Sequence, residues 1–390
     1  MSKVAILSYG HVDPILPLFQ RISQSIDTTL ILVFSQKAKR ESILSFEDIP
    51  VRNGFQESKT NRLILDKIGL AQETNRIRIF IYHNNRIRSI QNTYLSFKLA
   101  IELRKYDLIH FNGQHTTFNL LYYFLYGIKK LFVIHDYKPH TGEGGTSYLF
   151  SCYYTNKFIL RTKWPVIIQN KYDFELIKKE LNLFENKLFY IPFGAFENYL
   201  HWFNPEIKQQ KYDLLFFGRI SLYKGIDYLL EAMIKIQSQR PATNLCIAGS
   251  GNLETTNLKK LDLKNVTVFN QYIDSRFLVE LIQNSKIVVC PYTDATQSGV
   301  AMTAFAFNKP VIASAVGGFP DIIEDGKNGY LVPPKDSAKL ADAILRSFKD
   351  ELVYDKMKEN IIDFKNNSSF SWDKITKMYL QLYISILNSK

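Results

Sequence analysis

The stretch from residue 284 to residue 334 constrains the fold more than any other part of the sequence. Its apolar run Ile287–Cys290 is bounded by Pro291 and predicts a short buried strand. A polar loop follows, then the small and apolar residues 300–307, which predict a helix, and then a second buried strand at 310–313. Short apolar runs alternate with helical patterns in the same way along both halves of the chain. This alternation predicts an α/β fold with two doubly wound parallel sheets.

The loop inside this unit has the composition of an anion-binding site. Gln297, Ser298 and Gly299 precede the predicted helix, and small residues there let a phosphate approach the backbone. The unpaired N–H groups and partial positive charge of a helix N-terminus favour such a ligand. In open α/β sheets, ligands bind at the carboxyl ends of the strands, where this loop would lie. The alternative is a packing unit with a tight turn, since short glycine motifs recur by chance.

Four further motifs follow a fixed order along the chain. They are Val133-Ile134-His135-Asp136, the segment from Phe216 to Gly225, Ala248-Gly249-Ser250-Gly251 and Phe370-Ser371-Trp372-Asp373. With the loop above, they make nearly the whole chain resemble family 4 glycosyltransferases, in a branch with a Gln-Ser-Gly donor loop. The resemblance implies the GT-B fold, in which two Rossmann-like domains face each other across a cleft. It also implies a nucleotide-diphosphate sugar as donor substrate and no cofactor.

A polar segment with Pro205, residues 197–211, predicts the linker between the two domains. Residues 1–200 are therefore expected to form a Rossmann-like domain that binds the acceptor. Residues 201–370 are expected to form a second one that binds the nucleotide sugar. The resemblance implies that the C-terminal helix, residues 371–390, crosses back to the first domain.

The donor site implied by the resemblance is centred on two cations of the second domain. The Arg219 guanidinium suits a diphosphate bidentately, and Lys224 adds a flexible point charge. A cation beside a helix N-terminus is electrostatically unfavourable unless an anion lies there, which favours a phosphate site over a plain surface pair. The other candidates for donor binding are Gly10, Gly249, Gly251, Tyr272, Asp294, Gln297, Ser298, Gly299 and Thr303.

The sequence departs from the family pattern at two positions. Ala295 and Thr303 stand where the family usually has two glutamates, eight positions apart, that contact the donor. Asp294, one residue from the first position, is a hypothetical substitute. Retention by same-face attack, with the leaving phosphate taking the acceptor proton, needs no protein nucleophile, so a retaining transfer stays the prediction.

The catalytic candidates lie at and after the end of a predicted strand in the first domain. His135 and Asp136 end the strand, and the resemblance implies that His135 contacts the donor sugar. His140 and Glu143 follow in a glycine-containing loop, which could act as an acceptor-side lid. His and Glu can serve as acid, base or hydroxyl-binding groups, so an inverting transfer with His140 or Glu143 as base is the alternative. For His140 alone, a turn histidine bonded to a backbone carbonyl is the simpler interpretation.

Charge points to an anionic partner. The formal net charge is +12; residues 1–200 hold 26 Lys and Arg against 17 Asp and Glu, and the remainder holds 23 against 20. Such a field attracts acidic lipid, lipid-linked phosphate or nucleic acid. Stacking aromatics interleaved with the cations are missing, so nucleic acid is not expected. The cations expected to form a basic rim are Arg76, Arg78, Arg86, Arg88, Arg104 and Lys105. The interpretations are peripheral contact with an acidic membrane or a solvated face.

Other sequence features bear on the cellular compartment and on metal binding. Three cysteines without metal-site or disulfide spacing favour a reducing compartment. No hydrophobic leader precedes the strand-like run that starts at Val4, and no apolar run is long enough to span a bilayer. A cytoplasmic protein, at the inner face of the membrane, is therefore expected. No Asp-x-Asp motif suggests a metal, so no metal site is predicted.

The predicted function is a hexosyltransferase that moves a sugar from a nucleotide-diphosphate donor to a hydroxyl of a glycan or lipid-linked saccharide, in bacterial surface polysaccharide or glycoconjugate synthesis. Two alternatives stay open. One is a degenerate, non-catalytic subunit that binds a nucleotide sugar, suggested by Ala295 and Thr303. The other is a GT-B epimerase.

Overall fold

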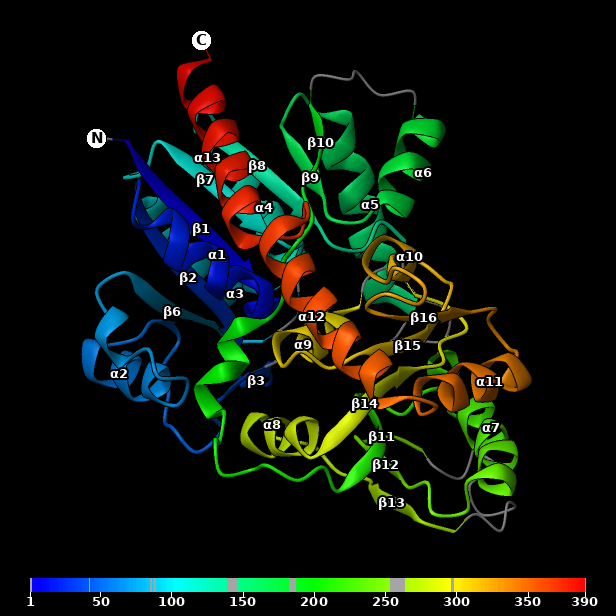
Figure 1. Ribbon diagram of the computed structural model, residues 1–390. Helices are drawn as coiled ribbons and strands as arrows, with labels where there is room; N and C mark the ends of the chain where they lie inside the picture. The colour runs from blue at the N-terminus through cyan, green and yellow to red at the C-terminus, as the bar shows by residue number, and fades with distance from the viewer. Residues whose placement is uncertain are drawn as a thin grey trace.

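Two parallel β-sheets organise the chain (Figure 1). The computed structural model describes residues 2–41, 43–84, 86, 89–138, 146–181, 187–252, 264–295 and 298–389, without the side chains of residues 40, 41, 116 and 146–152. The predicted fold class, two α/β Rossmann-like units with parallel sheets, is confirmed. Most strands read from the sequence are buried runs of Val, Ile, Leu and Phe, as expected for sheets covered on both faces, whereas the edge strand Val266–Phe269 is half-buried.

The first sheet has eight strands in the order β10-β9-β8-β7-β1-β2-β6-β5. All pairs are parallel except β5 with β6. The strands are β1 (Lys3–Tyr9), β2 (Asp27–Ser35), β5 (Gly54–Phe55), β6 (Ile77–Tyr82), β7 (Leu108–Asn112), β8 (Lys129–Ile134), β9 (Val166–Ile168) and β10 (Leu188–Tyr190). A separate hairpin pairs β3 (Arg40–Glu41) with β4 (Leu44–Ser45).

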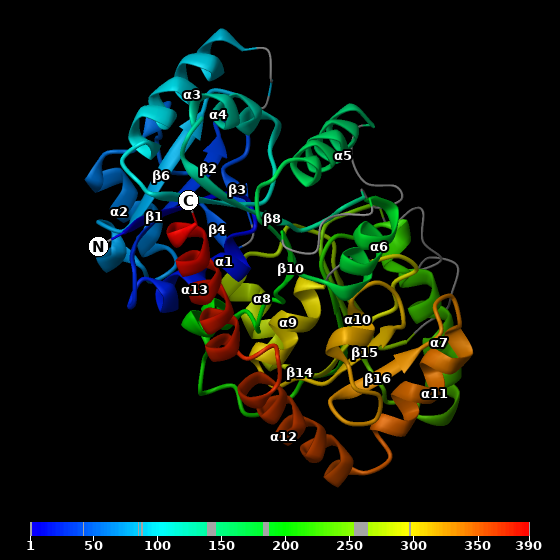
Figure 2. The same cartoon turned by 90° about the horizontal axis from the view of Figure 1, so that it is seen from above.

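Helices cover both faces of this sheet. One face packs against α3, α4, α5 and α6, and the other against α1, α2 and the C-terminal helix α13. Figure 2 shows α3, α4 and α5 on the side of the sheet away from α1 and α13. These helices are α1 (Val12–Ile22), α2 (Ser58–Asp66), α3 (Ile90–Leu103), α4 (Asn119–Phe124), α5 (Thr146–Arg161), α6 (Lys171–Leu181) and α13 (Trp372–Asn388).

The second sheet has six parallel strands in the order β13-β12-β11-β14-β15-β16. The strands are β11 (Tyr212–Phe217), β12 (Leu245–Ala248), β13 (Val266–Phe269), β14 (Ser285–Cys290), β15 (Val311–Ser314) and β16 (Gly329–Val332). The helices of this half are α7 (Ile226–Gln239), α8 (Ser275–Gln283), α9 (Gly299–Ala306), α10 (Phe319–Ile322), α11 (Ser337–Ser347) and α12 (Glu351–Asn367). Short 3₁₀ segments among the described residues are η1 (Ala71–Glu73), η2 (Thr116–Phe118), η3 (Glu197–Trp202) and η4 (Leu222–Lys224).

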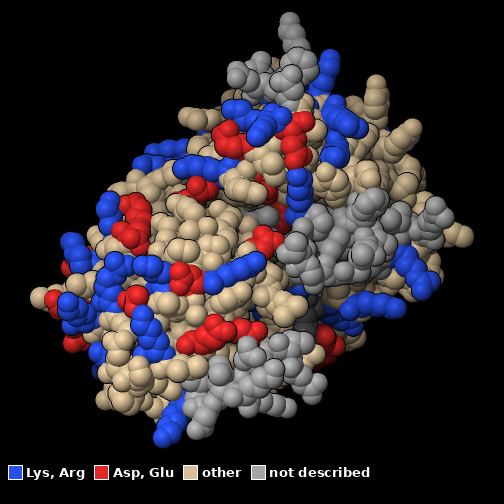
Figure 3. Space-filling model, turned by 90° about the vertical axis from the view of Figure 1, so that its right-hand side faces the viewer, with Lys and Arg blue, Asp and Glu red and all other residues tan. Residues whose placement is uncertain are grey.

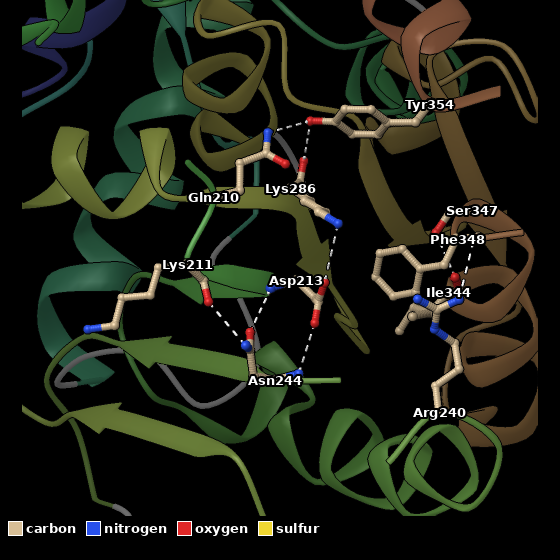
Figure 4. A network of polar contacts seen from close by, with 10 residues as sticks. All are labelled: Gln210, Lys211, Asp213, Arg240, Asn244, Lys286, Ile344, Ser347, Phe348 and Tyr354. Carbon is tan, nitrogen blue, oxygen red and sulfur yellow. Dashed lines mark hydrogen bonds and ion pairs between the residues drawn. The ribbon is translucent and has the colours of Figure 1, made fainter. Parts of the chain in front are cut away.

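A polar network ties the amino ends of three strands in the second sheet together (Figure 4). Asp213 and Asn244 bond reciprocally, because each backbone N–H donates to the other's side-chain oxygen at 2.7 and 3.1 Å. Lys286 at the start of β14 lies 3.7 Å from the Asp213 carboxylate. The Tyr354 hydroxyl of α12 donates to the Lys286 carbonyl at 3.3 Å. This edge is thus fixed by its own side chains, and the opposite edge, where the strands end, carries the loops of interest.

The two halves are joined through the segment before η3 and through α13. Trp372 donates its indole N–H to the Ala195 carbonyl at 2.8 Å, and Phe196 N–H donates to the Met302 carbonyl of α9 at 3.2 Å. At its far end α13 lies beside the first sheet, where Lys129 Nζ donates to the Leu387 carbonyl at 2.7 Å. Such a cation also complements the C-terminal end of the helix dipole. Among the described helices, none is long and apolar enough to cross a bilayer.

Candidate active site

A pair of stacked histidines lies where β1 and β8 end. The rings of His11 and His135 are 3.7 Å apart between centroids and inclined by 15°. Strand β7 separates β1 from β8, and Gly113 follows it with φ at 85°. A β-carbon on Gly113 would lie 3.0 Å from Cδ2 of His11 and 3.4 Å from Cδ2 of His135. Glycine is therefore the residue that lets three neighbouring strand ends converge on one histidine pair.

A chain of hydrogen bonds determines which ring nitrogen of His135 carries the proton. Ser8 Oγ donates to the Gly10 carbonyl at 2.6 Å and accepts from Asn112 Nδ2 at 2.9 Å. The Asn112 amide oxygen must then face His135, where it lies 3.2 Å from Nε2. Because an amide oxygen only accepts, Nε2 of His135 carries the proton and Nδ1 the lone pair. The predicted donor residue Gly10 thus takes part through its backbone carbonyl.

Both histidines are held neutral at pH 7. Burial lowers the pKa of His135 well below 6.5; the neighbouring imidazoles of His11 and His110 also disfavour a proton on it, and a hydrogen bond with the Gln169 side chain acts in the opposite direction. Desolvation also lowers the pKa of His11, and the charge of Asp136 partly offsets this. His11 as a residue is nonetheless exposed. The pair is therefore shielded by protein on one side and accessible on the other, as a substrate-binding group must be.

Asp136 is exposed at the end of β8, beside this pair. Its carbonyl accepts a hydrogen bond from Asn156 Nδ2 of α5 at 3.0 Å, and its charge acts on His11. The predicted catalytic residues His135 and Asp136 therefore adjoin His11. The other two, His140 and Glu143, lie outside the described residues.

In the second half of the chain, the loops after β11 and β12 pack backbone against backbone. Ile220 N–H donates to the Ser250 carbonyl at 2.9 Å, and Ile220 pairs with Gly251 as an isolated bridge. A β-carbon on Gly249 would lie 1.8 Å from the Gly218 carbonyl oxygen, so the loops meet too closely for a side chain. Packing thus accounts for Gly249 and Gly251. Arg219, within the β11 loop, has an exposed side chain.

Lys224 in η4 lies over the end of β14. Its Nζ is 3.9 Å from the centre of the buried Tyr292 ring, a cation–π contact. A backbone hydrogen bond also joins η4 to the loop after β14, because Thr293 N–H donates to the Tyr223 carbonyl at 2.7 Å. The β11 loop also approaches α9, since a β-carbon on Gly218 would be 3.9 Å from Val300 Cγ2. The Arg219 loop, the Lys224 turn and the first turn of α9 therefore adjoin at the carboxyl edge of the second sheet.

The hydroxyl groups of helix α9 and its N-cap form hydrogen bonds with the backbone of the same helix. Ser298 is the N-cap and accepts from Ala301 N–H at 3.2 Å, while Thr303 donates to the Gly299 carbonyl at 2.8 Å. Both side chains are buried, and Gly299 packs against the Phe196 ring. The first turn of α9 therefore presents backbone N–H groups, rather than side chains, to a ligand. Gln297 lies outside the described residues.

Two further candidates lie near the joint between the halves. Tyr272 is exposed after β13, near the buried Tyr199, whose hydroxyl donates to Asp13 of α1 at 3.4 Å. Asp294 is half-buried next to the buried Ala295. Within the described ranges, no group of three or more His, Cys, Asp and Glu side chains is placed to hold a metal ion.

The part of the chain that carries these loops has a recognised family. Residues 201–364 match the family model described as glycosyl transferases group 1. These residues are a glycosyltransferase group 1 domain. Arg219, Lys224 and the α9 turn all lie inside it.

Three similar proteins extend the comparison. An uncharacterized glycosyltransferase of Methanocaldococcus jannaschii is 32% identical over 177 residues, 44% of this chain and 44% of its own length, so less than half of that relative is matched. An uncharacterized 41.2 kDa protein in the cps region of Klebsiella pneumoniae is 26% identical over 332 residues, 82% of this chain and 89% of its own. The crystal structure of Anabaena HepE in complex with UDP-glucose has a TM-score of 0.68 at 16% identity, and covers 99% of this chain and 100% of its own. At that identity the likeness shows the GT-B fold alone.

Sequence reasoning missed several residues that shape the site next to the group 1 domain. Ser8, Asn112 and Gly113 orient the histidine pair, and Tyr292 seats Lys224. The available signal was the polar end of the buried run 107–113, which placed Asn112 and Gly113 at a strand terminus. That run alone does not reveal that β7 lies between β1 and β8.

Proposed function

We propose that this protein is a glycosyltransferase of family 4 type, which moves a hexosyl group from a nucleotide-diphosphate sugar to a hydroxyl of a glycan or lipid-linked saccharide. The observation that carries the proposal is the convergence of the Arg219 loop, Lys224 and the α9 turn within a group 1 domain. Two cations beside a helix N-terminus suit a diphosphate. HepE, which shares the fold, has been crystallised with UDP-glucose, and this supports the donor class.

The proposed chemistry is electrostatic. The bond between the anomeric carbon and the diphosphate breaks, and the nucleotide leaves with the charge that Arg219, Lys224 and the α9 N–H groups stabilise. The acceptor oxygen attacks the same face of the sugar, and the departing phosphate oxygen takes its proton, so the anomeric configuration is retained. No protein nucleophile, metal or cofactor is required by this scheme. Neutral His135 would hydrogen-bond a sugar hydroxyl.

Inversion is the alternative stereochemical outcome. It would need a base on the acceptor side, for which His140 and Glu143 are the candidates. The acceptor would bind the first domain, residues 1–200 with the helix 371–390, and the nucleotide sugar would bind residues 201–370. The similarity to a protein of the cps region of Klebsiella pneumoniae supports a role in surface polysaccharide or glycoconjugate synthesis. Such acceptors favour peripheral contact with an acidic membrane on its cytoplasmic side.

A second candidate function is a subunit that binds the nucleotide sugar without turning it over. The observation that favours it is the α9 region, where Ala295 is buried and the Thr303 hydroxyl is bonded to the Gly299 carbonyl. Neither position offers the carboxylate that the resembled family uses. An epimerase would share the donor site and act without an acceptor.

The decisive experiment combines donor binding with turnover. Thermal unfolding is measured with UDP-, GDP-, dTDP- and ADP-sugars, where a ligand at a hundred times its dissociation constant should stabilise the fold by about 2.7 kcal/mol. A shift with one nucleotide followed by release of that nucleotide in the presence of acceptor supports the transferase. A shift with no turnover on any acceptor supports the binding subunit. Interconversion of the donor without acceptor supports the epimerase, and no shift at all contradicts all three.

A further inference from the structure

Helix α3 exposes an apolar stripe. Ile90, Tyr94, Phe97 and Ile101 are 90%, 57%, 51% and 53% exposed, and their spacing of four, three and four residues places them on one side of the helix. The opposite side, with Leu95, Leu99 and Leu103, is buried against the first sheet. A surface helix normally turns charged residues to solvent, so α3 is apolar on the side where it should be polar.

Exposed aromatic residues also lie on the next two helices. Tyr123 and Tyr126, in and just after α4, are each 86% exposed, and Tyr154 and Phe158 of α5 are 53% and 55% exposed. Phe97 of the stripe meets Phe124 of α4 at 5.8 Å between ring centroids. Figure 2 shows α3, α4 and α5 on one side of the first sheet. We call this surface the α3–α5 face; its residues are Ile90, Tyr94, Phe97, Ile101, Tyr123, Tyr126, Tyr154 and Phe158.

Most of the charges that border the α3–α5 face are positive; one exposed acid, Asp107, lines a pocket together with Arg104 and Tyr126. Helices α4 and α5 contain no acidic residue, and the one acid of α3, Glu102, is occupied by Arg78 and Lys105 at 2.7 Å each. The exposed or half-exposed cations beside the aromatic residues are Lys98, Arg104, Lys157, Arg161 and Lys163. On the side of the molecule drawn in Figure 3, by contrast, Lys and Arg are interspersed with Asp and Glu.

We propose that the α3–α5 face docks on the surface of an anionic lipid bilayer. Phe and Ile side chains would enter the boundary between headgroups and acyl chains, Tyr would sit at the headgroup level, and the bordering cations would meet acidic headgroups. The cations fit this occupant better than a second copy of the chain, because two copies would bring like charges together.

Docking would place the candidate catalytic strand end at the lipid surface. Asn156 of α5 is buried and donates to the Asp136 carbonyl at 3.0 Å, while Tyr154 and Phe158, two residues away on either side, are exposed. The helix that carries part of the α3–α5 face is therefore bonded to β8 beside the His11–His135 pair. This inference rests on the proposed function, since it makes a lipid-linked saccharide the acceptor class.

Vesicle flotation of the full chain tests the proposal. Phosphatidylcholine vesicles with about one third phosphatidylglycerol are compared with pure phosphatidylcholine, since anionic lipid supplies the attraction. The apolar variant is Phe97→Gln with Ile101→Gln and Tyr126→Gln, and the charge variant is Lys157→Gln with Arg161→Gln. The matched control is Ile234→Gln with Leu352→Gln, two exposed apolar residues of α7 and α12 at 50% and 76% exposure.

Wild type and control are expected to float with the anionic vesicles and not with pure phosphatidylcholine. Both test variants should bind at least about tenfold more weakly, and added salt should weaken the wild type. Equal binding by the variants, or no flotation of the wild type, overturns the proposal. So does sedimentation showing that the wild type is a dimer and the apolar variant a monomer. Nucleotide-induced thermal shifts, measured without lipid, report the proposed function separately and should be the same in all variants.

Discussion

The Tyr383 hydroxyl lies 2.7 Å from Nδ1 of His110, and so joins the C-terminal helix α13 to the central strand β7. Both side chains are fully buried, and the Tyr379 ring stacks on the same imidazole at 5.6 Å between centroids. The last helix of the chain therefore packs a titratable group of the first sheet into the protein interior. Burial lowers the pKa of His110 from 6.5 to about 3.

Acid should destabilise the protein through this histidine. The unfolded chain binds a proton at His110 below about pH 6.5, but the folded chain does so only near pH 3, so stability is full above 6.5 and falls as the pH decreases toward 3. The loss is about 1.4 kcal/mol for each pH unit in that window. Urea unfolding at several pH values should show a shallower slope for His110→Asn than for wild type.

His115 provides the matched comparison for that experiment. It is also buried, with a pKa lowered by burial to about 3, but it stacks on Tyr9 rather than on α13. His115→Asn should flatten the pH dependence by a similar amount. An unchanged slope in both variants would contradict the assignment of acid sensitivity to buried neutral histidines.

Asn112 is expected to control the proton of His135. Replacing Asn112 with Leu removes the amide oxygen that Nε2–H donates to, so the tautomer is no longer fixed and turnover should fall by about a hundredfold. Nucleotide binding to the group 1 domain should not change. Asn112→Asp keeps an acceptor but adds negative charge, which raises the pKa of His135; its kcat/KM should then decline as the pH falls, in a range where wild type is flat. Identical pH profiles for Asn112→Asp and wild type would show that Asn112 does not act through His135.

Arg219 and Lys224 should be needed for turnover. Arg219→Ala and Lys224→Met each remove one cation from the proposed diphosphate site, and kcat should decrease by about 10² to 10³. Met is used at position 224 because an apolar side chain can keep the contact with the Tyr292 ring. Lys235→Ala, which removes an exposed ion pair with Asp342 on the same half of the chain, is the control and should leave kcat unchanged. Wild-type rates for both site variants would refute the phosphate assignment.

Features of the fold can be predicted from the sequence where they depend on residues that are neighbours along the chain. The buried runs of the two sheets are visible in the sequence because apolar residues of that length and type rarely form anything else. Residues 37–49, in contrast, have apolar spacing that favours a helix, and the structure has the β3–β4 hairpin there. Leu44 and Phe46 are fully buried, so tertiary packing overrides the local pattern.

The predicted basic rim shows that the surroundings of charged residues also depend on tertiary packing. Arg78 was expected on a surface facing acidic lipid, but its guanidinium lies 3.9 Å over the Phe55 ring and is paired with Glu102. Only the placement of β5 beside β6, and of α3 over both, shows that this cation is engaged within the protein. For the same reason the apolar stripe of α3 could not be recognised as exposed from its sequence.

Two glycines with positive φ allow the cost of backbone strain to be measured separately from the cost of a steric clash. Gly225 and Gly127 both have positive φ, 66° and 81°. A β-carbon on Gly225 would lie 1.9 Å from the Pro291 carbonyl oxygen, at the end of β14, whereas one on Gly127 meets nothing within 4 Å. Gly127→Ala should therefore cost only the left-handed strain, about 1 to 2 kcal/mol of unfolding free energy.

Gly225→Ala should add the displacement of the β14 loop to the same strain, for a total of about 3 to 5 kcal/mol. Because Pro291 precedes Tyr292, on which Lys224 rests, this variant should also weaken the nucleotide-induced thermal shift, and Gly127→Ala should not. Urea unfolding and thermal shift of both variants check the two effects. Equal losses of stability at the two glycines would show that the β11 and β14 loops do not pack as closely as the backbone of Gly225 and Pro291 indicates.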